Sequence, residues 1–400
     1  MSNSQNVVLY EKKALPAKVL LIGLALLAIG GGLAGMGFAN DSVRASYNLV
    51  IVFLWLFSVG FGALFLIALE HIVGADWSVP FRRITEILAG VVFIVPIIAI
   101  PLLLNLDQVF VWLNPQIVEA DKYIQGKAPY LNESFFIMRN VAIFAVMIIF
   151  FFLLPGRSFR QDKNPNPKSA KLSAKFSAIF FPIFAISITV IGMDWLMSLE
   201  PKWFSTIFGV YYFAGSVLST LSILTIIVIT LKDNGYLSKY ITEDHYYNLG
   251  GLMFAFTNFW AYIAFSQFLL IWYANIPDET MWYMDRSEGG WWVMSLGIIF
   301  VRFGIPYLLL VTRPSKSNPF RLRIIAIWVF LAHYYDLYWM IMPEYAKRNG
   351  VDGPIFGLTE LSAPFIVVGA IMLVLGILSR NRNLMPVGDP KFKKGLEFHL

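Results

Sequence analysis

The chain has 400 residues, of which 58% are hydrophobic and 14% carry a charged side chain. A soluble globular domain has roughly 25% charged residues, so this composition excludes a soluble globular protein and indicates a polytopic membrane protein. The sequence contains no cysteine, which excludes disulfides, Cys-ligated zinc, iron–sulfur clusters and covalently attached haem within this chain.

Ten apolar stretches follow one another along the sequence, each long enough for a helix that crosses a bilayer, which takes about 20 residues. A β-barrel would show short alternating segments, so we expect an all-α integral membrane protein with about ten transmembrane helices. The first stretch is too long for a signal peptide and is interpreted as a membrane helix. The predicted spans lie near 17–37, 46–73, 83–104, 134–154, 173–198, 205–231, 249–275, 290–312, 321–343 and 359–379.

The segments outside the spans are short, and no soluble domain is expected. The predicted organisation is a tail (1–16), a polytopic membrane domain (17–379) and a C-terminal tail (380–400). The segment 155–175 is basic and rich in Pro and Asn, which is typical of a mobile connector. The C-terminal tail is short and basic, and we expect it to be solvated.

The lysines and arginines are distributed unevenly between the two sides. With ten spans both termini lie on one side, and the terminal segments and even-numbered loops hold 22 of the 31 Lys and Arg residues, against 7 in the odd-numbered loops. Positive residues favour the cytoplasmic side, so we expect both termini in the cytoplasm. Because these charges are spread over every cytoplasmic loop, nucleic-acid binding is not expected.

Two segments stand out on the predicted outer face. Residues 105–132 form the longest external loop and carry three acidic side chains. Residues 275–292 are acidic and aromatic, which indicates an interfacial aromatic belt. A docking surface for an external protein partner is the alternative interpretation. Pro96 and Pro101 are expected to break span three, and Pro182 is expected to break span five.

Asp194 lies within span five, about one and a half turns before Glu200 and Pro201, which end the span. An aspartate at a helix centre costs at least roughly 2.5 kcal/mol on insertion scales, so such a residue is expected to be paired, hydrated or functional. Ser187 and Ser198 share its stripe at helical spacing. Asp194 is interpreted either as a structural helix-end carboxylate or as part of an outer proton or quinone cluster.

His333 and Asp336 lie three residues apart in span nine and therefore project from one face of the helix. Tyrosines 334, 335 and 338 surround them in the sequence. In one interpretation the two side chains simply hydrogen-bond each other. In the other, the pair is suited to proton-coupled chemistry, in which the carboxylate orients the imidazole and the imidazole exchanges a proton near neutral pH.

The remaining ionisable and polar residues of the spans fall at several depths. Arg302 is near mid-bilayer, where a carboxylate partner is expected. The ion pair either holds helices together or takes part in a proton relay, and both interpretations are open. Arg139 at a helix start is interpreted as an interfacial anchor. His71 and His333 lie at opposite depths, so a shared haem is not expected. Candidates for a proton path, beside the outer cluster, are Glu70, His71 and Glu86 on the inner side and Arg302, Gln267, Glu200 and Glu360 farther out, with Glu344 at the same rim. For the three inner residues the alternative interpretation is structural pairing with Arg82 or Arg83.

Two long motifs carry a resemblance to a known family. GMDWLMSLEPKWFSTIFGVYYFAG (192–215) and YYNLGGLMFAFTNFWAYIAFSQFLLIWYANIPDETMWY (246–283) closely resemble the second quinone-binding-type membrane subunit (ActF type) of bacterial alternative complex III. That complex is a quinol:cytochrome c oxidoreductase, and the subunit is similar to the NrfD/polysulfide-reductase-like membrane family. The resemblance is strongest from about 180 to 345.

The resemblance implies two tandem four-helix bundles with flanking helices, in a complex that oxidises quinol. It further implies a sister NrfD-like membrane subunit, multihaem cytochrome c and iron–sulfur subunits as partners, with a terminal oxidase as a further candidate partner, besides membrane lipids. Haem and iron–sulfur centres would belong to those partners. The cofactor expected for this chain is at most a quinone or quinol, either menaquinone or ubiquinone.

Quinol oxidation releases two electrons and two protons, so a subunit without redox centres suits proton or quinone handling. We expect Asp194, His333 and Asp336 to form an outer proton or quinone cluster, and the other buried ionisable residues to mark a transmembrane proton path. The chain would not be catalytic alone. The alternatives are a secondary transporter and a purely structural membrane scaffold.

Overall fold

The structure is a computed structural model that describes residues 15–164, 166, 168–237, 241–380 and 382–400. The described residues form helices and connecting segments without a strand, in agreement with the all-α prediction. Within them, ten helical spans are long and apolar enough to cross a membrane, so the protein is a multi-pass membrane protein. In chain order the spans are α1 (Ala17–Asn40), α2 (Ser42–Val73), α3–η1–α4 (Val79–Leu88, Ala89–Phe93, Val95–Leu103), α7–α8 (Glu133–Leu153, Pro155–Gln161), α9–η4 (Lys168–Trp195, Met197–Leu199), α10 (Phe208–Asp233), α11 (Glu243–Ala274), α13–η5–α14 (Trp291–Ile298, Ile299–Gly304, Ile305–Leu310), α16 (Pro319–Asn349) and α17 (Leu358–Leu378).

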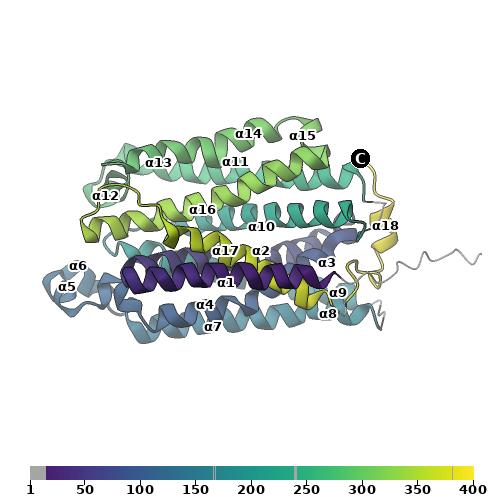
Figure 1. The fold of residues 1–400 in the computed structure, drawn as a ribbon, viewed down its shortest axis with the longest axis horizontal. Coiled ribbons are helices and arrows are strands. Elements are labelled where there is room, and N and C mark those ends of the chain that lie inside the picture. The colour runs from purple at the N-terminus through teal and green to yellow at the C-terminus, as the bar shows by residue number, and fades with distance from the viewer. Residues whose placement is uncertain (1–14, 165, 167, 238–240, 381) are drawn as a thin grey trace, which may run out of the picture.

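Short helices mark the two ends of the molecule, which are called here the α12 end and the α18 end (Figure 1). The first described span begins at the α18 end, and the chain finishes there too. The short elements are η2 (Leu106–Gln108), η3 (Val111–Leu113), α5 (Pro115–Ala120), α6 (Lys122–Lys127) and α12 (Pro277–Asp285), with α15 (Arg313–Ser317) and α18 (Phe392–Leu396) at the opposite end.

The helix α2 forms the centre of the fold, because every side chain from Ala45 to Ala68 is buried. A helix that is apolar all round must be surrounded by other helices. On one side α2 packs against the interrupted third span and against α9. The helix α7 contacts both of these, and the four spans make a first bundle. The spans α10, α11, α13–η5–α14 and α16 make a second bundle, which meets the first along α2 and α9. The two tandem four-helix bundles are therefore present.

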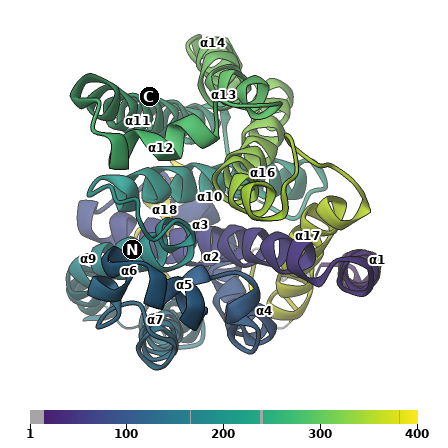
Figure 2. The same ribbon diagram turned by 90° about the vertical axis from the view of Figure 1, so that its left-hand side faces the viewer.

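The spans α1 and α17 flank the two bundles and lie side by side at one edge (Figure 2). Their backbones approach closely because glycines face the partner helix: a Cβ at Gly23 would lie 2.8 Å from the backbone nitrogen of Leu373. At Gly369 a Cβ would lie 2.9 Å from the backbone nitrogen of Leu27. Small residues at such positions allow membrane helices to pack by close backbone contact.

The third and eighth spans change helix type near their middle, whereas the fourth and fifth are divided only near one end. The helix α9, which was expected to break at Pro182, is continuous there. The third span changes to a 3-10 helix at Ala89–Phe93, and Pro96 lies in the first turn of the following α4; the predicted break at Pro101 is wrong, because α4 runs through it to Leu103. The eighth span contains a π-helical turn at Ile299–Gly304, followed by Pro306. The predicted break at Pro182 is wrong, because α9 runs through it from Lys168 to Trp195.

The segments at both ends are more structured than their composition indicated. Helices α8 and α9 take up most of the predicted connector 155–175, and the long outer loop holds α5 and α6. The C-terminal tail is not simply solvated: Phe392 is buried, and the Asp389 carboxylate lies 2.8 Å from Arg82 Nη1. Of the predicted tails and connector, residues 1–14, 165, 167 and 381 lie outside the described residues.

Candidate functional site

The strongest candidate site is a buried polar cluster where α2, α10, α16 and the π-helical turn meet. It is called here the central cluster, and all its side chains are at most 4% exposed. Three members were predicted from the sequence and come together, whereas two were not predicted. The members are Arg302 on the π-helical turn, His333 and Asp336 on α16, Tyr211 on α10 and Ser58 on α2.

The carboxylate of Asp336 is held by two different helices. Arg302 Nε lies 3.2 Å from Oδ2, and the Tyr211 hydroxyl donates to Oδ1 at 2.6 Å. The guanidinium carbon also lies 5.3 Å from the ring centroid of Trp260. Arg302 therefore has the buried carboxylate partner that its depth predicted, as a buried charge requires.

His333 does not bond Asp336 directly, because Arg302 contacts both residues. Arg302 Nη2 lies 3.0 Å from Nδ1 of the imidazole, and Ser58 Oγ lies 3.1 Å from Nε2. A guanidinium can only donate, so Nδ1 accepts the hydrogen bond and the imidazole is neutral, with its proton on Nε2. That proton faces Ser58.

The tyrosines next to His333 in the sequence do not join the cluster. The hydroxyls of Tyr334, Tyr335 and Tyr338 donate to backbone carbonyl groups elsewhere, on residues 360, 294 and 355. Tyr211 takes the expected role instead. It is the first residue of a YY pair in the motif 192–215, and only the contact between α10 and α16 distinguishes it from its neighbour.

Hydroxyl groups continue from Ser58 along α10. Ser58 Oγ lies 2.9 Å from Ser216 Oγ and donates to the Tyr212 hydroxyl at 3.1 Å. Thr220 Oγ1 donates to the Ser58 carbonyl at 2.9 Å. Ser219 is fully buried, and its hydroxyl has no hydrogen-bond partner among the described residues. A row of hydroxyls thus runs from the imidazole toward the α18 end.

Local backbone features allow Arg302 to reach this position. Gly215 on α10 leaves the space that the guanidinium occupies, since a Cβ there would lie 2.8 Å from Arg302 Nη2 and 3.4 Å from His333 Cε1. The π-helical turn, of a kind frequent at functional sites, contains Arg302 itself. Within the described residues, Arg302 Nη1 has no hydrogen-bond partner although it is buried.

Asp194 belongs to a different site, near the α12 end. Arg139 donates to both carboxylate oxygens, at 2.9 Å and 3.0 Å, and the Tyr130 hydroxyl donates to Oδ1 at 3.0 Å. Burial raises the pKa of Tyr130, so this hydroxyl stays protonated as a donor. Among the described residues, no hydrogen bond or ion pair joins Asp194 to His333 or Asp336. Arg139 is an ion-pair partner and not the predicted interfacial anchor.

The three ionisable residues predicted on the inner side lie near the α18 end. Arg82 Nε lies 2.7 Å from Glu70 Oε2, and Arg83 Nη1 lies 2.7 Å from Glu86 Oε2. Each glutamate therefore forms an ion pair with a neighbouring arginine, but neither carboxylate oxygen of the buried Glu86 has a hydrogen-bond partner among the described residues. His71 Nε2 is buried without a hydrogen-bond partner in the described part of the chain.

The predicted residues at the α12 end are also engaged. Arg44 donates to both carboxylate oxygens of the fully buried Glu360, and Lys347 Nζ lies 3.2 Å from Glu200 Oε2. The Gln267 side chain is bonded to Ser205 at 3.1 Å and to the Tyr283 hydroxyl at 3.0 Å. None of these residues contacts the central cluster through a hydrogen bond that the described residues make.

A buried cation in the aromatic segment 275–292 was not singled out from the sequence. The Arg286 guanidinium lies 3.6 Å from the Trp282 ring centroid and 3.5 Å from Glu344 Oε1. Trp282 and Trp291 are at most 5% exposed, so these two do not form an interfacial belt. The signal in the sequence was an arginine four residues after a tryptophan, on the same face of one helix.

One group of carboxylates in the described part of the chain has the spacing of metal ligands. The carboxylates of Glu200, Asp285 and Glu344 have oxygens within 4.8 Å of one another. Lys347 Nζ bonds Glu200 and Asp285, and Arg286 bonds Glu344, so their charges already have cationic partners. Both ring nitrogens of His333 are engaged in hydrogen bonds.

A comparison of the chain with protein-family models found no match, and neither did a comparison with curated proteins. The function is therefore argued from the residues of the site and from the sequence resemblance.

Proposed function

We propose that this membrane protein is a subunit, without redox centres of its own, of a quinol:cytochrome c oxidoreductase of the alternative complex III type. Its role is to transfer protons that accompany quinol oxidation. The observation that carries this proposal is the central cluster, where a neutral imidazole lies between a buried ion pair and a row of hydroxyls. Ionisable groups at this depth in a membrane bundle mark functional sites by default.

The chemistry follows from the geometry around His333. The imidazole holds a proton on Nε2 and faces the Ser58 hydroxyl, which can turn toward Ser216. A proton that reaches Nδ1 would create an imidazolium, which Asp336 would stabilise once Arg302 shifts from the imidazole toward the carboxylate. Histidine is suited to this exchange because its usual pKa lies near neutral pH.

Ionisable and polar groups at three levels support a path across the bundle. Glu70, His71 and Glu86 would act near the α18 end, the central cluster at the midpoint, and Asp194, Glu200, Gln267 and Glu360 near the α12 end. We propose that the α18 end faces the cytoplasm of a bacterium and that the chain lies in its cytoplasmic membrane. The excess of Lys and Arg in the terminal segments and even-numbered loops supports this orientation.

A quinone head group finds a poor fit beside Asp194. A quinone needs hydrogen-bond donors for its two oxygens, but the hydroxyls of Tyr130 and Ser198 already donate to Asp194. We therefore propose the proton-transfer role for this chain and place no reaction step on a bound quinone. Haem and iron–sulfur centres are proposed for the partner subunits, since the sequence has no cysteine and four histidines.

Purification of the tagged chain from its native membrane tests this proposal. We expect a sister membrane subunit, a multihaem cytochrome c subunit and an iron–sulfur subunit to co-purify, with a haem spectrum and quinol:cytochrome c turnover. A homogeneous preparation of this chain alone, without haem, contradicts the proposal.

One observation favours a secondary transporter as a second candidate. The third and the eighth spans both change helix type near their middle, and they are the third spans of two successive halves of five. Broken helices at matching positions are a feature of transporters with inverted repeats. A chain that purifies alone and moves a solute in proteoliposomes would support this candidate. A pure scaffold would instead tolerate neutralisation of the central cluster without loss of turnover.

A further inference from the structure

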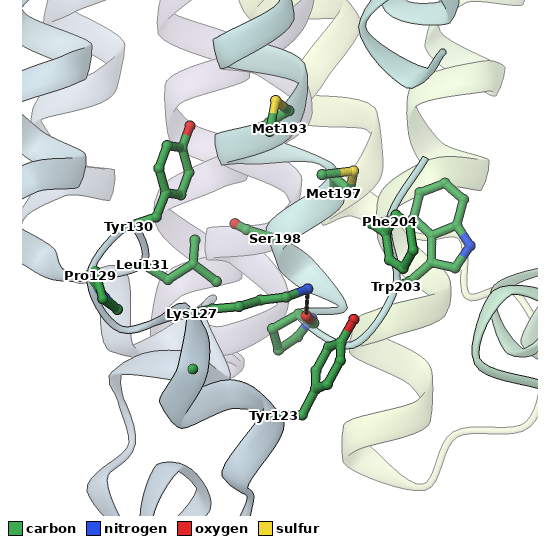
Figure 3. Close-up of a pocket in the computed structure, with 12 residues that line it drawn as sticks. Tyr123, Lys127, Pro129, Tyr130, Leu131, Met193, Met197, Ser198, Trp203 and Phe204 are labelled. Carbon is green, nitrogen blue, oxygen red and sulfur yellow. Dashed lines mark hydrogen bonds between the residues drawn. The ribbon is translucent and has the colours of Figure 1, made fainter. Parts of the chain in front are cut away.

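A pocket of about 440 Å³ lies at the α12 end, apart from the central cluster (Figure 3). Its walls come from α6, the segment 129–131, the end of α9 with η4, and the segment 201–204. This volume is within the range of pockets that bind small molecules, roughly 300–1,000 Å³.

Most of the lining is apolar or aromatic. Met193, Met197, Leu131, Trp203 and Phe204 face the pocket (Figure 3). The hydroxyls of Tyr130 and Ser198 also belong to the wall, but both already donate to Asp194. A ligand of this pocket must therefore offer a large apolar part.

The wall carries one cation, Lys127. Its ammonium donates to the Pro201 carbonyl at 2.6 Å and lies 4.6 Å from the ring centroid of Tyr123. Among the described residues, no carboxylate forms an ion pair with it, since the neighbouring Asp121 pairs with Lys202 and Asp194 pairs with Arg139. Burial lowers the pKa of Lys127, and this effect outweighs the attraction of the Glu200 carboxylate, which forms its ion pair with Lys347.

An exposed apolar stripe of α9 leads to the pocket from the middle of the membrane span. Ile186, Val190 and Met193 of α9 and Met197 of η4 recur at helical spacing; Ile186 is 67% exposed, and the other three are half-buried. The last two residues line the pocket. An apolar chain lying on this stripe would place its polar end beside α6.

We propose that this pocket binds a membrane amphiphile with a negatively charged head group, which pairs with Lys127 while its acyl chain follows the stripe of α9. The head group is a fatty-acid carboxylate or the phosphate of an anionic phospholipid. A neutral ligand fits less well, because it would leave the ammonium without a counter-charge. This inference does not depend on the proposed role of the central cluster.

The experiment uses the full chain in phosphatidylcholine nanodiscs, with photoreactive palmitate and photoreactive phosphatidylglycerol as two separate probes. Light-induced labelling is mapped by peptide mass spectrometry. We expect labels on Met193, Met197 or the segment 201–204, and loss of labelling by about tenfold in Lys127→Met, which corresponds to about 1.4 kcal/mol. Lys127→Arg should retain labelling, and Lys122→Met, at an exposed position of the same helix, should be unchanged.

The two probes distinguish the sources of the anion. Labelling by palmitate alone assigns the head group to a carboxylate, and labelling by phosphatidylglycerol alone assigns it to a phosphate. Met197→Trp, which fills the pocket and keeps Lys127, should also abolish labelling. The proposal is overturned if neither probe labels the pocket, if Lys127→Met is labelled like the unmodified chain, or if palmitate methyl ester or a neutral quinone competes as well as palmitate.

Discussion

The central cluster and the Asp194 site both contain a buried arginine–carboxylate pair, but the two pairs are built differently. Arg139 engages both oxygens of Asp194 and stacks 3.9 Å from the Tyr130 ring centroid, so its charge is fully used within one site. Arg302 divides its contacts between Asp336 and the imidazole of His333, and one of its nitrogens has no partner in the described residues. An arginine that binds both oxygens of one carboxylate fixes the end of a helix. An arginine shared between a carboxylate and an imidazole can instead change its contacts when the imidazole gains or loses a proton.

The largest effect is expected from Asp336→Asn. Removal of this charge leaves Arg302 buried without a carboxylate, and breaking a buried pair from one side costs about 3–5 kcal/mol. Thermal unfolding of the purified chain in detergent checks the loss. The matched control is the double variant Arg302→Met/Asp336→Leu, which should recover most of the stability because no charge remains. A single variant no less stable than the double one would show that Arg302 and Asp336 are not coupled.

A smaller effect is expected from Gly215→Ala, which tests the geometry of the central cluster without changing any charge. The new Cβ would lie 2.8 Å from Arg302 Nη2 and would displace the guanidinium from His333, at a cost of about 1–3 kcal/mol. Gly192→Ala on α9 is the control, because its nearest neighbour lies at 3.6 Å. Equal melting temperatures for the two variants would contradict the close packing at Gly215.

Asp194→Asn should cost about 1–2 kcal/mol, less than Asp336→Asn. The amide oxygen can still accept from Tyr130 or Arg139, and Arg139 keeps 10% exposure to the surroundings. Thermal unfolding of both variants under the same conditions gives the comparison. If Asp194→Asn lowers the stability more than Asp336→Asn does, the Arg302–Asp336 pair is not the more important of the two for stability.

The smallest expected effect is the pH dependence of anion binding at Lys127, which lies beside the Asp194 site. The charged form of Lys127 binds the anionic probe, and burial lowers its pKa from the usual value of about 10.5. Binding is therefore complete below the lowered pKa and declines as pH rises through it. Between pH 7.5 and 9.5 photolabelling should fall by more than the roughly 10% that an ordinary lysine gives. A constant signal over this range would contradict the shift.

The ten spans were predictable from the sequence because the bilayer imposes length and apolarity on each helix. Span two was expected at 46–73 and α2 runs from Ser42 to Val73, since the carboxylate of Asp41 accepts from the Arg44 backbone nitrogen and so caps the helix there. Boundaries were less predictable where helices extend beyond the apolar run. Residues 155–161 and 115–127 form helices that lie outside the apolar stretches and were therefore not predicted.

The candidate site was predictable only in part. Burial of Arg302, His333 and Asp336 follows from their place in spans, and a carboxylate partner for Arg302 follows from the cost of an unpaired charge. Which carboxylate pairs with which arginine depends on the contact between helices far apart in the chain. Asp194 was grouped with His333 because both lie in the predicted outer half, but they belong to different bundles. Tyr211 and the space at Gly215 become visible only once α10 and α16 are packed together.

Proton release by the assembled complex that carries His333→Gln tests the central claim most directly. Glutamine can keep the hydrogen bonds to Arg302 and Ser58, but it cannot carry a proton at neutral pH. With haem content and subunit composition unchanged, we expect quinol-dependent proton release to fall by at least about tenfold. Ser222→Ala should stay within about twofold of the unmodified complex, as a control at a fully buried residue of α10 whose hydroxyl donates to the Leu218 carbonyl. An assembled His333→Gln complex that releases protons at the normal rate would contradict a proton-transfer role for the central cluster.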